Sequence, residues 1–285
     1  MRSKIQEFKL AVLEGDFDII AIVETWLHPD ILDSEIFTGN SYVIYRRDRC
    51  VDKHQRGGGV LLAVKSDLSS SLLPLKFSEG IEQVCVHIGP SAKIKYSMYI
   101  FLSYIPPASH VDVYTKHLEN ILLLAGNANY NDNFIVLGDY NLPGISWKFD
   151  SDDKILIPFN ISSEAERIFV DSLMLNNFTQ INCVPNSHGK FLDLVFLSED
   201  FRFSVFHVEA PLIPTDSHHY AICILLDRYE FLGDLKLGMP SSIDLNFSKA
   251  DFSALNNYIS SVNWSETLNC LSLDDMYAQL IDSLL

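Results

Sequence analysis

The feature that most constrains this chain is the segment Phe134-Ile-Val-Leu-Gly-Asp-Tyr-Asn141, an apolar run that ends in polar residues. Consecutive apolar residues bounded by polar ones are typical of a strand that is covered on both faces of its sheet. Gly138 lets the backbone turn, so Asp139 and Asn141 follow where the strand is expected to end. Because side chains two residues apart in a strand point the same way, we expect the carboxylate and the carboxamide side by side at the rim of a core.

Two interpretations of this pair are open. A carboxylate beside an amide suits a hard, oxygen-seeking cation such as Mg²⁺, with the amide left to orient a phosphate or a water molecule. Alternatively, Asp139 and Asn141 only satisfy backbone groups of a local turn. The two residues alone do not choose between these interpretations.

Length and composition favour a globular protein. With 285 residues, 48% of them hydrophobic, the chain can form one large α/β domain or two small ones. No apolar run approaches the length of a membrane-spanning helix, and residues 1–9 lack the apolar segment of a signal peptide. The five cysteines are scattered, without a Cys-x-x-Cys pair. We therefore expect an intracellular protein of the nucleus or cytoplasm, not secreted and not bound to a membrane, without a disulfide framework or a zinc site.

The charge balance runs against tight nucleic-acid binding. Lysine and arginine number 21 against 37 aspartate and glutamate residues, which gives a formal net charge of −16. A tight nucleic-acid binder is usually basic. Acidic clusters can hold metal ions, but most of these carboxylates are expected to form a solvated surface. Basic residues concentrate between Arg46 and Arg56, where a local basic patch can form.

Periodicity and turn signals predict a mixture of helices and strands up to Tyr229. The composition changes after that residue, where Gly233 and Gly238-Met-Pro240 indicate a linker. We therefore predict a main domain over residues 1–230 and a linker with a helical tail over 231–285. The predicted helices are 3–14 (ending at Gly15), 111–124 and 162–175, and the predicted strands are 18–24, 42–45, 58–64, 84–88, 96–104, 134–137, 191–196, 203–208 and 220–226.

Four further polar residues, Glu24, Tyr104, Asp193 and His219, belong to the ends or the interior of predicted apolar strands. Three have a structural alternative: Glu24 can cap a strand, Tyr104 can be a core aromatic, and His219 can be a hydrogen-bonded loop histidine. Asp193 is more constraining, because it interrupts the apolar run 191–196 and a carboxylate there is costly unless it is paired. A histidine is a natural partner, so we predict that the Asp193 carboxylate contacts the His219 ring.

Six segments in this order resemble a known superfamily. They are Val23-Glu-Thr-Trp-Leu27, Gln55-Arg-Gly-Gly-Gly-Val60, Ser103-Tyr-Ile-Pro-Pro107, Leu137-Gly-Asp-Tyr-Asn141, Phe191-Leu-Asp-Leu-Val-Phe196 and His219-Tyr-Ala-Ile222. Together they resemble the endonuclease/exonuclease/phosphatase superfamily of Mg²⁺-dependent phosphodiesterases, and within it the endonuclease domain of non-LTR, jockey-like retrotransposons. The resemblance implies a DNase I-like α/β fold, in which two β-sheets pack face to face between helices in four α/β/β/α layers.

The resemblance also implies roles for individual residues. Glu24 is expected to bind Mg²⁺, with Mn²⁺ as an alternative, and Asp139 to orient or deprotonate the attacking water. Asn141 and Tyr104 are expected to hold the scissile phosphate. The implied substrate is DNA, bound weakly because the protein is acidic.

His219 is expected to contact a non-bridging phosphate oxygen and to stabilise charge in the transition state, with Asp193 fixing the tautomer of its ring. The implied product is a nick with a 3′-hydroxyl, which in the retrotransposon branch primes reverse transcription. The tail resembles the connector that leads to a reverse transcriptase in such elements.

Two departures from the family pattern leave alternatives open. The family opens with a strand ending in an asparagine of the metal site, whereas this chain starts at Met1 inside the first predicted helix. The family also has an aspartate before the last histidine, where this chain has His218, and Asp216 lies two residues too early. One alternative is a catalytically inactive or domesticated remnant that acts as a binding module. Another is a phosphatase or phosphodiesterase for a small or lipid phosphate, which an acidic surface would suit better.

Overall fold

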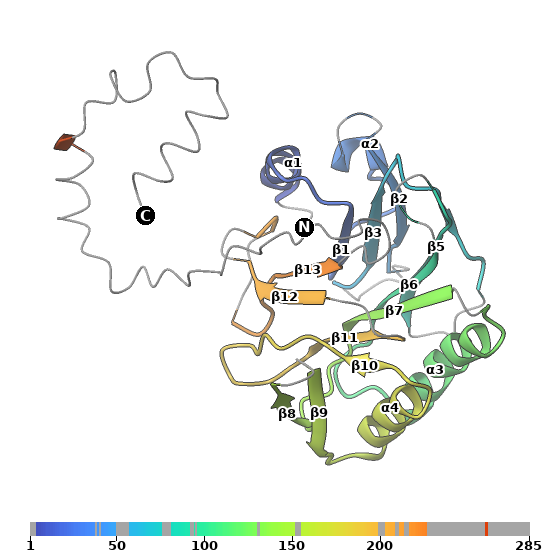
Figure 1. Ribbon diagram of the computed structural model, residues 1–285. Helices are drawn as coiled ribbons and strands as arrows, with labels where there is room; N and C mark the ends of the chain where they lie inside the picture. The colour runs from blue at the N-terminus through green and yellow to red at the C-terminus, as the bar shows by residue number, and fades with distance from the viewer. Residues whose placement is uncertain are drawn as a thin grey trace, which may run out of the picture. The chain divides into compact units, whose positions relative to one another are not determined.

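The computed structural model describes most of the main domain (Figure 1). The described residues are 4–37, 39, 41–49, 57–75, 81–91, 94, 96–129, 132–151, 155–198, 203–208, 211–213, 217–226 and 260–261. The chain divides into two units, Met1–Phe231 and Leu232–Leu285. The predicted helical tail lies outside the described residues except for Ser260 and Ser261, as do Asp216 and residues 50–56 of the predicted basic patch.

An eight-stranded sheet forms the centre of the first unit, in the order β4-β5-β6-β7-β11-β10-β9-β8. Strands β6 and β7 run parallel, and β7 and β11 run antiparallel. The long apolar segments that the sequence predicts as strands lie in its middle: β5 (Glu82–Ile88), β6 (Ser97–Tyr104), β7 (Asp132–Asp139) and β11 (Asp193–Leu197). Shorter strands complete it: β4 (Ser70–Leu72), β8 (Ser146–Asp150), β9 (Ile155–Asn160) and β10 (Thr179–Gln180).

A second β layer packs on one face of this sheet. It contains the antiparallel sheet β1-β3-β2 and the antiparallel pair β12-β13. The elements are β1 (Ile19–Val23), β2 (Tyr42–Arg47), β3 (Val60–Lys65), β12 (Phe203–His207) and β13 (Ile222–Leu226). Buried side chains of β3, such as Leu62, share one hydrophobic cluster with those of β5 and β6, such as Val86 and Ile100, and apolar residues of β12 and β13 pack against it.

Helices cover the outer faces of both β layers (Figure 1). Helices α3 (Val111–Gly126) and α4 (Glu164–Met174) bury residues such as Leu118 and Phe169 against the eight-stranded sheet. Helices α1 (Ile5–Glu14) and α2 (Asp33–Ile36) bury Phe8 and Ile36 against β1 and β3. The order of layers is therefore α/β/β/α, which confirms the predicted fold class. Among the described residues, no helix is long and apolar enough to cross a membrane.

The structure corrects one sequence-based detail that bears on the site. Asp193 is the first residue of β11 and does not interrupt a strand, because Phe191 and Leu192 lie before the strand and are not part of it. The side chain of Asp193 is consequently 26% exposed at the N-terminal end of β11. Its carboxylate therefore avoids the full cost of burial in the middle of a strand.

Candidate active site

Three neighbouring strands of the central sheet place three of the predicted site residues in one row. Tyr104 at the end of β6 lies beside Asp139 at the end of β7, and Asp139 lies opposite Asp193 at the start of β11. Gly138 permits this close approach, because a Cβ atom there would lie 1.8 Å from the Ser103 carbonyl oxygen. The register of the sheet therefore assembles a hydroxyl and two carboxylates at the same end of three central strands.

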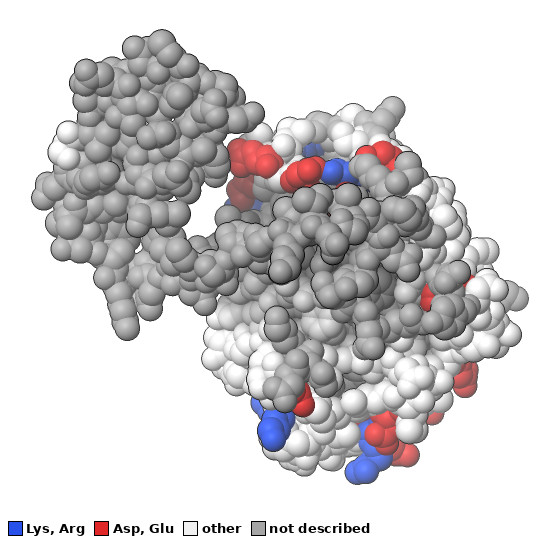
Figure 2. Space-filling model, viewed as in Figure 1, with Lys and Arg blue, Asp and Glu red and all other residues white. Residues whose placement is uncertain are grey.

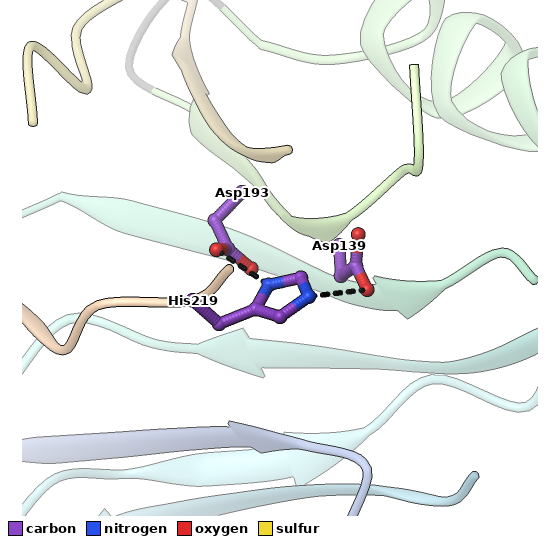
Figure 3. Close-up of side chains that lie close together, drawn as sticks. All are labelled: Asp139, Asp193 and His219. Atoms are coloured by element: carbon purple, nitrogen blue, oxygen red, sulfur yellow. Dashed lines mark hydrogen bonds and ion pairs between the residues drawn. The ribbon is translucent and has the colours of Figure 1, made fainter. Parts of the chain in front are cut away.

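His219 joins this row from the segment that precedes β13 (Figure 3). Its Nδ1 lies 2.9 Å from Asp193 Oδ2, and its Nε2 lies 3.8 Å from Asp139 Oδ2. The expected contact between Asp193 and His219 is thus present. The Asp193 carboxylate accepts a hydrogen bond from the Nδ1–H group, and this contact holds the ring with Nε2 facing Asp139.

A neighbouring loop holds the segment that carries His219. The Asn186 side-chain Nδ2 donates a hydrogen bond to the His218 carbonyl oxygen at 3.1 Å, and the Ser187 hydroxyl donates to the Ser217 carbonyl oxygen at 2.8 Å. The rings of His188 and His218 also lie with their centroids 4.8 Å apart. These contacts fix the backbone on the N-terminal side of His219.

Asn141 orients the Asp139 carboxylate. Its backbone has a φ of 50°, so the chain leaves the extended conformation directly after β7. The Asn141 backbone N–H donates to Asp139 Oδ1 at 3.1 Å, and its Nδ2 donates to Asp139 Oδ2 at 2.9 Å and to the Ile105 carbonyl oxygen at 3.0 Å. The carboxylate and the carboxamide lie side by side as predicted, but a turn places them there and not the alternation of a strand.

The environment of Asp139 favours its protonated form. Asp139 is 2% exposed, and burial together with the charge of Asp193 raises its pKa to about 7, against the opposing effects of His219 and the Asn141 hydrogen bonds. A carboxyl group whose pKa lies near neutrality can exchange a proton with water at physiological pH. Asp139 is therefore suited to the role of a general base.

Glu24 lies beyond Tyr104, at the end of β1. Its backbone has a φ of 53°, and its Oε2 accepts hydrogen bonds from Trp26 Nε1 at 2.7 Å and from the Gly58 backbone N–H at 2.6 Å. Burial, followed by a hydrogen bond with Glu24, raises the pKa of the Tyr104 hydroxyl. Tyr104 thus connects Glu24 with the row of residues on the central sheet.

The described residues contain one group that could hold a metal ion. Ligand atoms of Asp139, Asp193 and His219 all lie within 4.8 Å of one another. Two carboxylates share this space with one imidazole, and burial followed by the charge of Asp193 raises the pKa of Asp139. These residues fit a divalent cation, because carboxylate oxygens are the ligands that Mg²⁺ and Mn²⁺ prefer. Glu24 is not a member of the group, and its predicted role as a metal ligand stays a prediction.

Sequence reasoning did not identify the residues that hold Glu24 in place. Trp26 and Gly58 donate to its carboxylate, and Arg49 and Glu82 flank the same loop. Three consecutive glycines, Gly57–Gly59, are the signal in the sequence that a backbone of unusual conformation lies there.

With this geometry established, comparison with known proteins assigns the family. Residues 2–217 match the Endonuclease/Exonuclease/phosphatase family, and the chain belongs to that family. The match ends two residues before His219 and confirms the family that the six segments predicted. No curated protein matches the chain.

Solved structures confirm the fold. The endonuclease domain of TRAS1, a telomere-specific non-LTR retrotransposon, is 14% identical, with 81% of this chain and 95% of that chain covered and a TM-score of 0.54. The AP endonuclease LMAP from Leishmania major is 13% identical, with 79% and 83% covered and a TM-score of 0.57. An AP endonuclease from Archaeoglobus fulgidus is 15% identical, with 79% and 95% covered and a TM-score of 0.51.

Proposed function

We propose that this protein is a Mg²⁺-dependent phosphodiester hydrolase that nicks DNA and derives from the endonuclease of a non-LTR retrotransposon. The observation that carries the proposal is the contact of His219 with Asp193 on one side and Asp139 on the other. The family supports hydrolysis of phosphate esters, and similarity to the TRAS1 endonuclease domain supports DNA as the substrate.

In this proposal each residue of the row has a separate task. Asp139, held by Asn141, accepts a proton from the attacking water, for which its raised pKa suits it. His219, oriented by Asp193, donates from Nε2 to a non-bridging phosphate oxygen when its ring is protonated. Tyr104 stays protonated, because burial and its hydrogen bond with Glu24 disfavour its deprotonation, and its hydroxyl would turn from Glu24 to donate a hydrogen bond to the phosphate.

Glu24 would hold the divalent cation, while the Asp139 and Asp193 carboxylates, which also fit such an ion, would act on the water and on His219. When bound, such a cation acts as a Lewis acid that polarises the phosphoryl oxygen. Because Mg²⁺ prefers oxygen ligands, His219 would contact the phosphate and not the metal.

Nicking of supercoiled plasmid DNA tests the proposal. We expect slow nicking in Mg²⁺ or Mn²⁺ that EDTA abolishes, and a loss of about 10²-fold or more in Asp139→Asn and His219→Gln. His218→Asp is expected to raise the rate, because it restores the carboxylate that the family has before this histidine. A folded wild-type protein that fails to nick DNA in both Mg²⁺ and Mn²⁺ would contradict the proposal.

The charge of the protein favours a second candidate function. With a net charge of −16, the chain is better matched to a small or lipid phosphate than to a polyanion. On the face in Figure 2, the described acidic and basic side chains lie in small mixed groups and form no broad basic surface. Hydrolysis of p-nitrophenyl phosphate or a phosphoinositide without plasmid nicking would favour this candidate, whereas metal binding without any turnover would favour an inactive binding module.

A further inference from the structure

A part-buried ion pair that the proposed reaction does not use lies next to the candidate site. The Arg49 guanidinium Nε donates a hydrogen bond to Glu82 Oε1, and the two side chains are 18% and 11% exposed. Arg49 follows β2, and Glu82 is the first residue of β5. Because burial of two charges carries a desolvation cost, a pair of this kind is weak evidence for stability and calls for another explanation.

Arg49 and Glu82 both contact the loop Gly57–Gly59, called the glycine loop below. The Gly59 backbone N–H donates to Glu82 Oε2, while the preceding N–H, that of Gly58, donates to Glu24 Oε2 at 2.6 Å. Consecutive amides of one loop are therefore shared between a residue of the candidate site and a residue of the ion pair.

Packing leaves the glycine loop little freedom to adopt another position. A Cβ atom on Gly58 would lie 2.4 Å from Arg49 Cζ, so the guanidinium rests directly on the loop backbone. The three glycines have φ values of 101°, 74° and 88°, a conformation that other residues rarely adopt. On its other side, the loop carbonyls of Gly58 and Gly59 accept hydrogen bonds from the backbone N–H groups of Trp26 and Thr25 at 2.9 and 3.1 Å.

Arg49 also reaches the residue that links Glu24 to the central sheet. Its Cζ atom lies 5.6 Å from the centroid of the Tyr104 ring, within the range of a cation–π contact. Arg49 thus contacts the glycine loop and Tyr104 at once, and Glu82 fixes the direction of its planar guanidinium.

We infer that Arg49 and Glu82 are positioning residues, which hold the glycine loop and Tyr104 and thereby set the places of the Glu24 carboxylate and the Tyr104 hydroxyl. Neither residue touches the reacting atoms. The inference rests on the proposed function, because Glu24 and Tyr104 matter only if the site hydrolyses a phosphodiester.

Steady-state kinetics of Glu82→Gln and Arg49→Lys test the effect on the reaction. Displacement of a catalytic group by a fraction of an ångström is expected to lower kcat by about 10–100-fold and to leave KM within about threefold. Because the two residues act as a unit, the double variant is expected to lose no more than the larger single effect. Arg46→Lys is the matched control, since Arg46 is 15% exposed and paired with Asp33 and Asp48, and it should retain kcat within about twofold.

A second measurement follows the loop without relying on activity. Trp26 lies against the glycine loop, where a Cβ atom on Gly57 would be 3.5 Å from Trp26 Cε2. In protein labelled with 5-fluorotryptophan, the ¹⁹F resonance of Trp26, assigned with Trp26→Phe, should move in Glu82→Gln and Arg49→Lys but not in Arg46→Lys. If Glu82→Gln does not fold, Arg49→Met/Glu82→Gln removes both charges and takes its place.

The two measurements separate this inference from the proposed function. An unmoved Trp26 resonance, or a kcat that is unchanged in the folded variants of an active enzyme, would overturn the inference. If the Trp26 resonance moves in the variants but the wild-type protein hydrolyses no phosphodiester, the result supports the positioning of the glycine loop by Arg49 and Glu82. It then overturns the proposed function alone.

Discussion

Asp139 is the residue whose charge state links the chemistry of the site to the stability of the protein. Its pKa in the folded protein, about 7, exceeds the ordinary aspartate value of 3.8. The folded state therefore binds this proton more tightly, and the resulting stabilisation is complete below about pH 4 and is lost as the pH rises through 7. We predict that the difference in Tm between Asp139→Asn, which cannot ionise, and wild type shifts in favour of the variant by at least about 2 °C as the pH rises from 5 to 8. Thermal unfolding without added metal measures this, and a difference that does not change with pH would contradict it.

Asp193 acts at the same scale but through another residue. Its carboxylate accepts the proton of His219 Nδ1, a function that a carboxamide cannot guarantee because its nitrogen is a donor. We predict that Asp193→Asn lowers kcat for plasmid nicking by about 10²-fold or more while the protein stays folded. Asn186→Ala, which frees the loop near His218, is expected to have a smaller effect in the same assay.

At the scale of elements, a buried glutamate and its hydrogen bonds define the start of α4. Glu166 is 3% exposed and accepts hydrogen bonds from the Gly144 backbone N–H at 2.7 Å and from the Ser162 hydroxyl at 2.8 Å. Although burial opposes it, these bonds and those of Ser163 lower the pKa of Glu166. Its stabilising contribution is therefore present near neutral pH and lost as the pH falls through that lowered pKa.

We predict that Glu166→Ala lowers the free energy of unfolding by about 2 kcal/mol at pH 7, because several buried donors lose their acceptor. The loss should become smaller in acid, where wild type also loses the charge. Chemical denaturation at both pH values is the measurement, and Glu164→Ala on the same first helical turn is the control. An equal effect of the two substitutions would argue against the role given to Glu166.

The strength of the local signal explains which elements the sequence predicts. Long apolar strands such as β6 and β7 and the capped helix α4 follow from periodicity and from the Ser163–Glu166 capping box. The elements α2, β4 and β10 are not predicted, because two to four residues carry little periodicity. The strands β8 and β9 are not predicted either, since β8 has only two apolar residues and β9 contains Pro158. The predicted place of Asp193 inside a strand is wrong for a related reason. The apolar residues Phe191 and Leu192 resemble a strand in sequence, but the Leu192 carbonyl oxygen accepts a hydrogen bond from the Tyr140 backbone N–H, in the turn after β7.

At the scale of the whole molecule, the fold brings together residues that no local pattern connects. The motifs that resemble the family name Asp139, Asp193 and His219, and the sheet register and the segment before β13 place them within reach. The Arg49–Glu82 pair is not predicted, because the residues are 33 positions apart in the sequence and each alone looks like a surface charge. Such contacts depend on how the layers pack, which composition and periodicity do not specify.

The net charge of −16 leads to a prediction about how the whole protein meets its substrate. Proteins that neutralise many DNA phosphates with lysine and arginine lose affinity steeply as salt rises, with a slope near −0.9 per phosphate contact. With few basic side chains available, we expect KM for plasmid DNA to change by less than about tenfold between 50 and 200 mM KCl at fixed Mg²⁺. Hydrolysis of bis(p-nitrophenyl) phosphate under the same conditions should not change and serves as the control. A steep rise of KM for DNA alone would show instead that the protein contacts many phosphates through a concentrated basic surface.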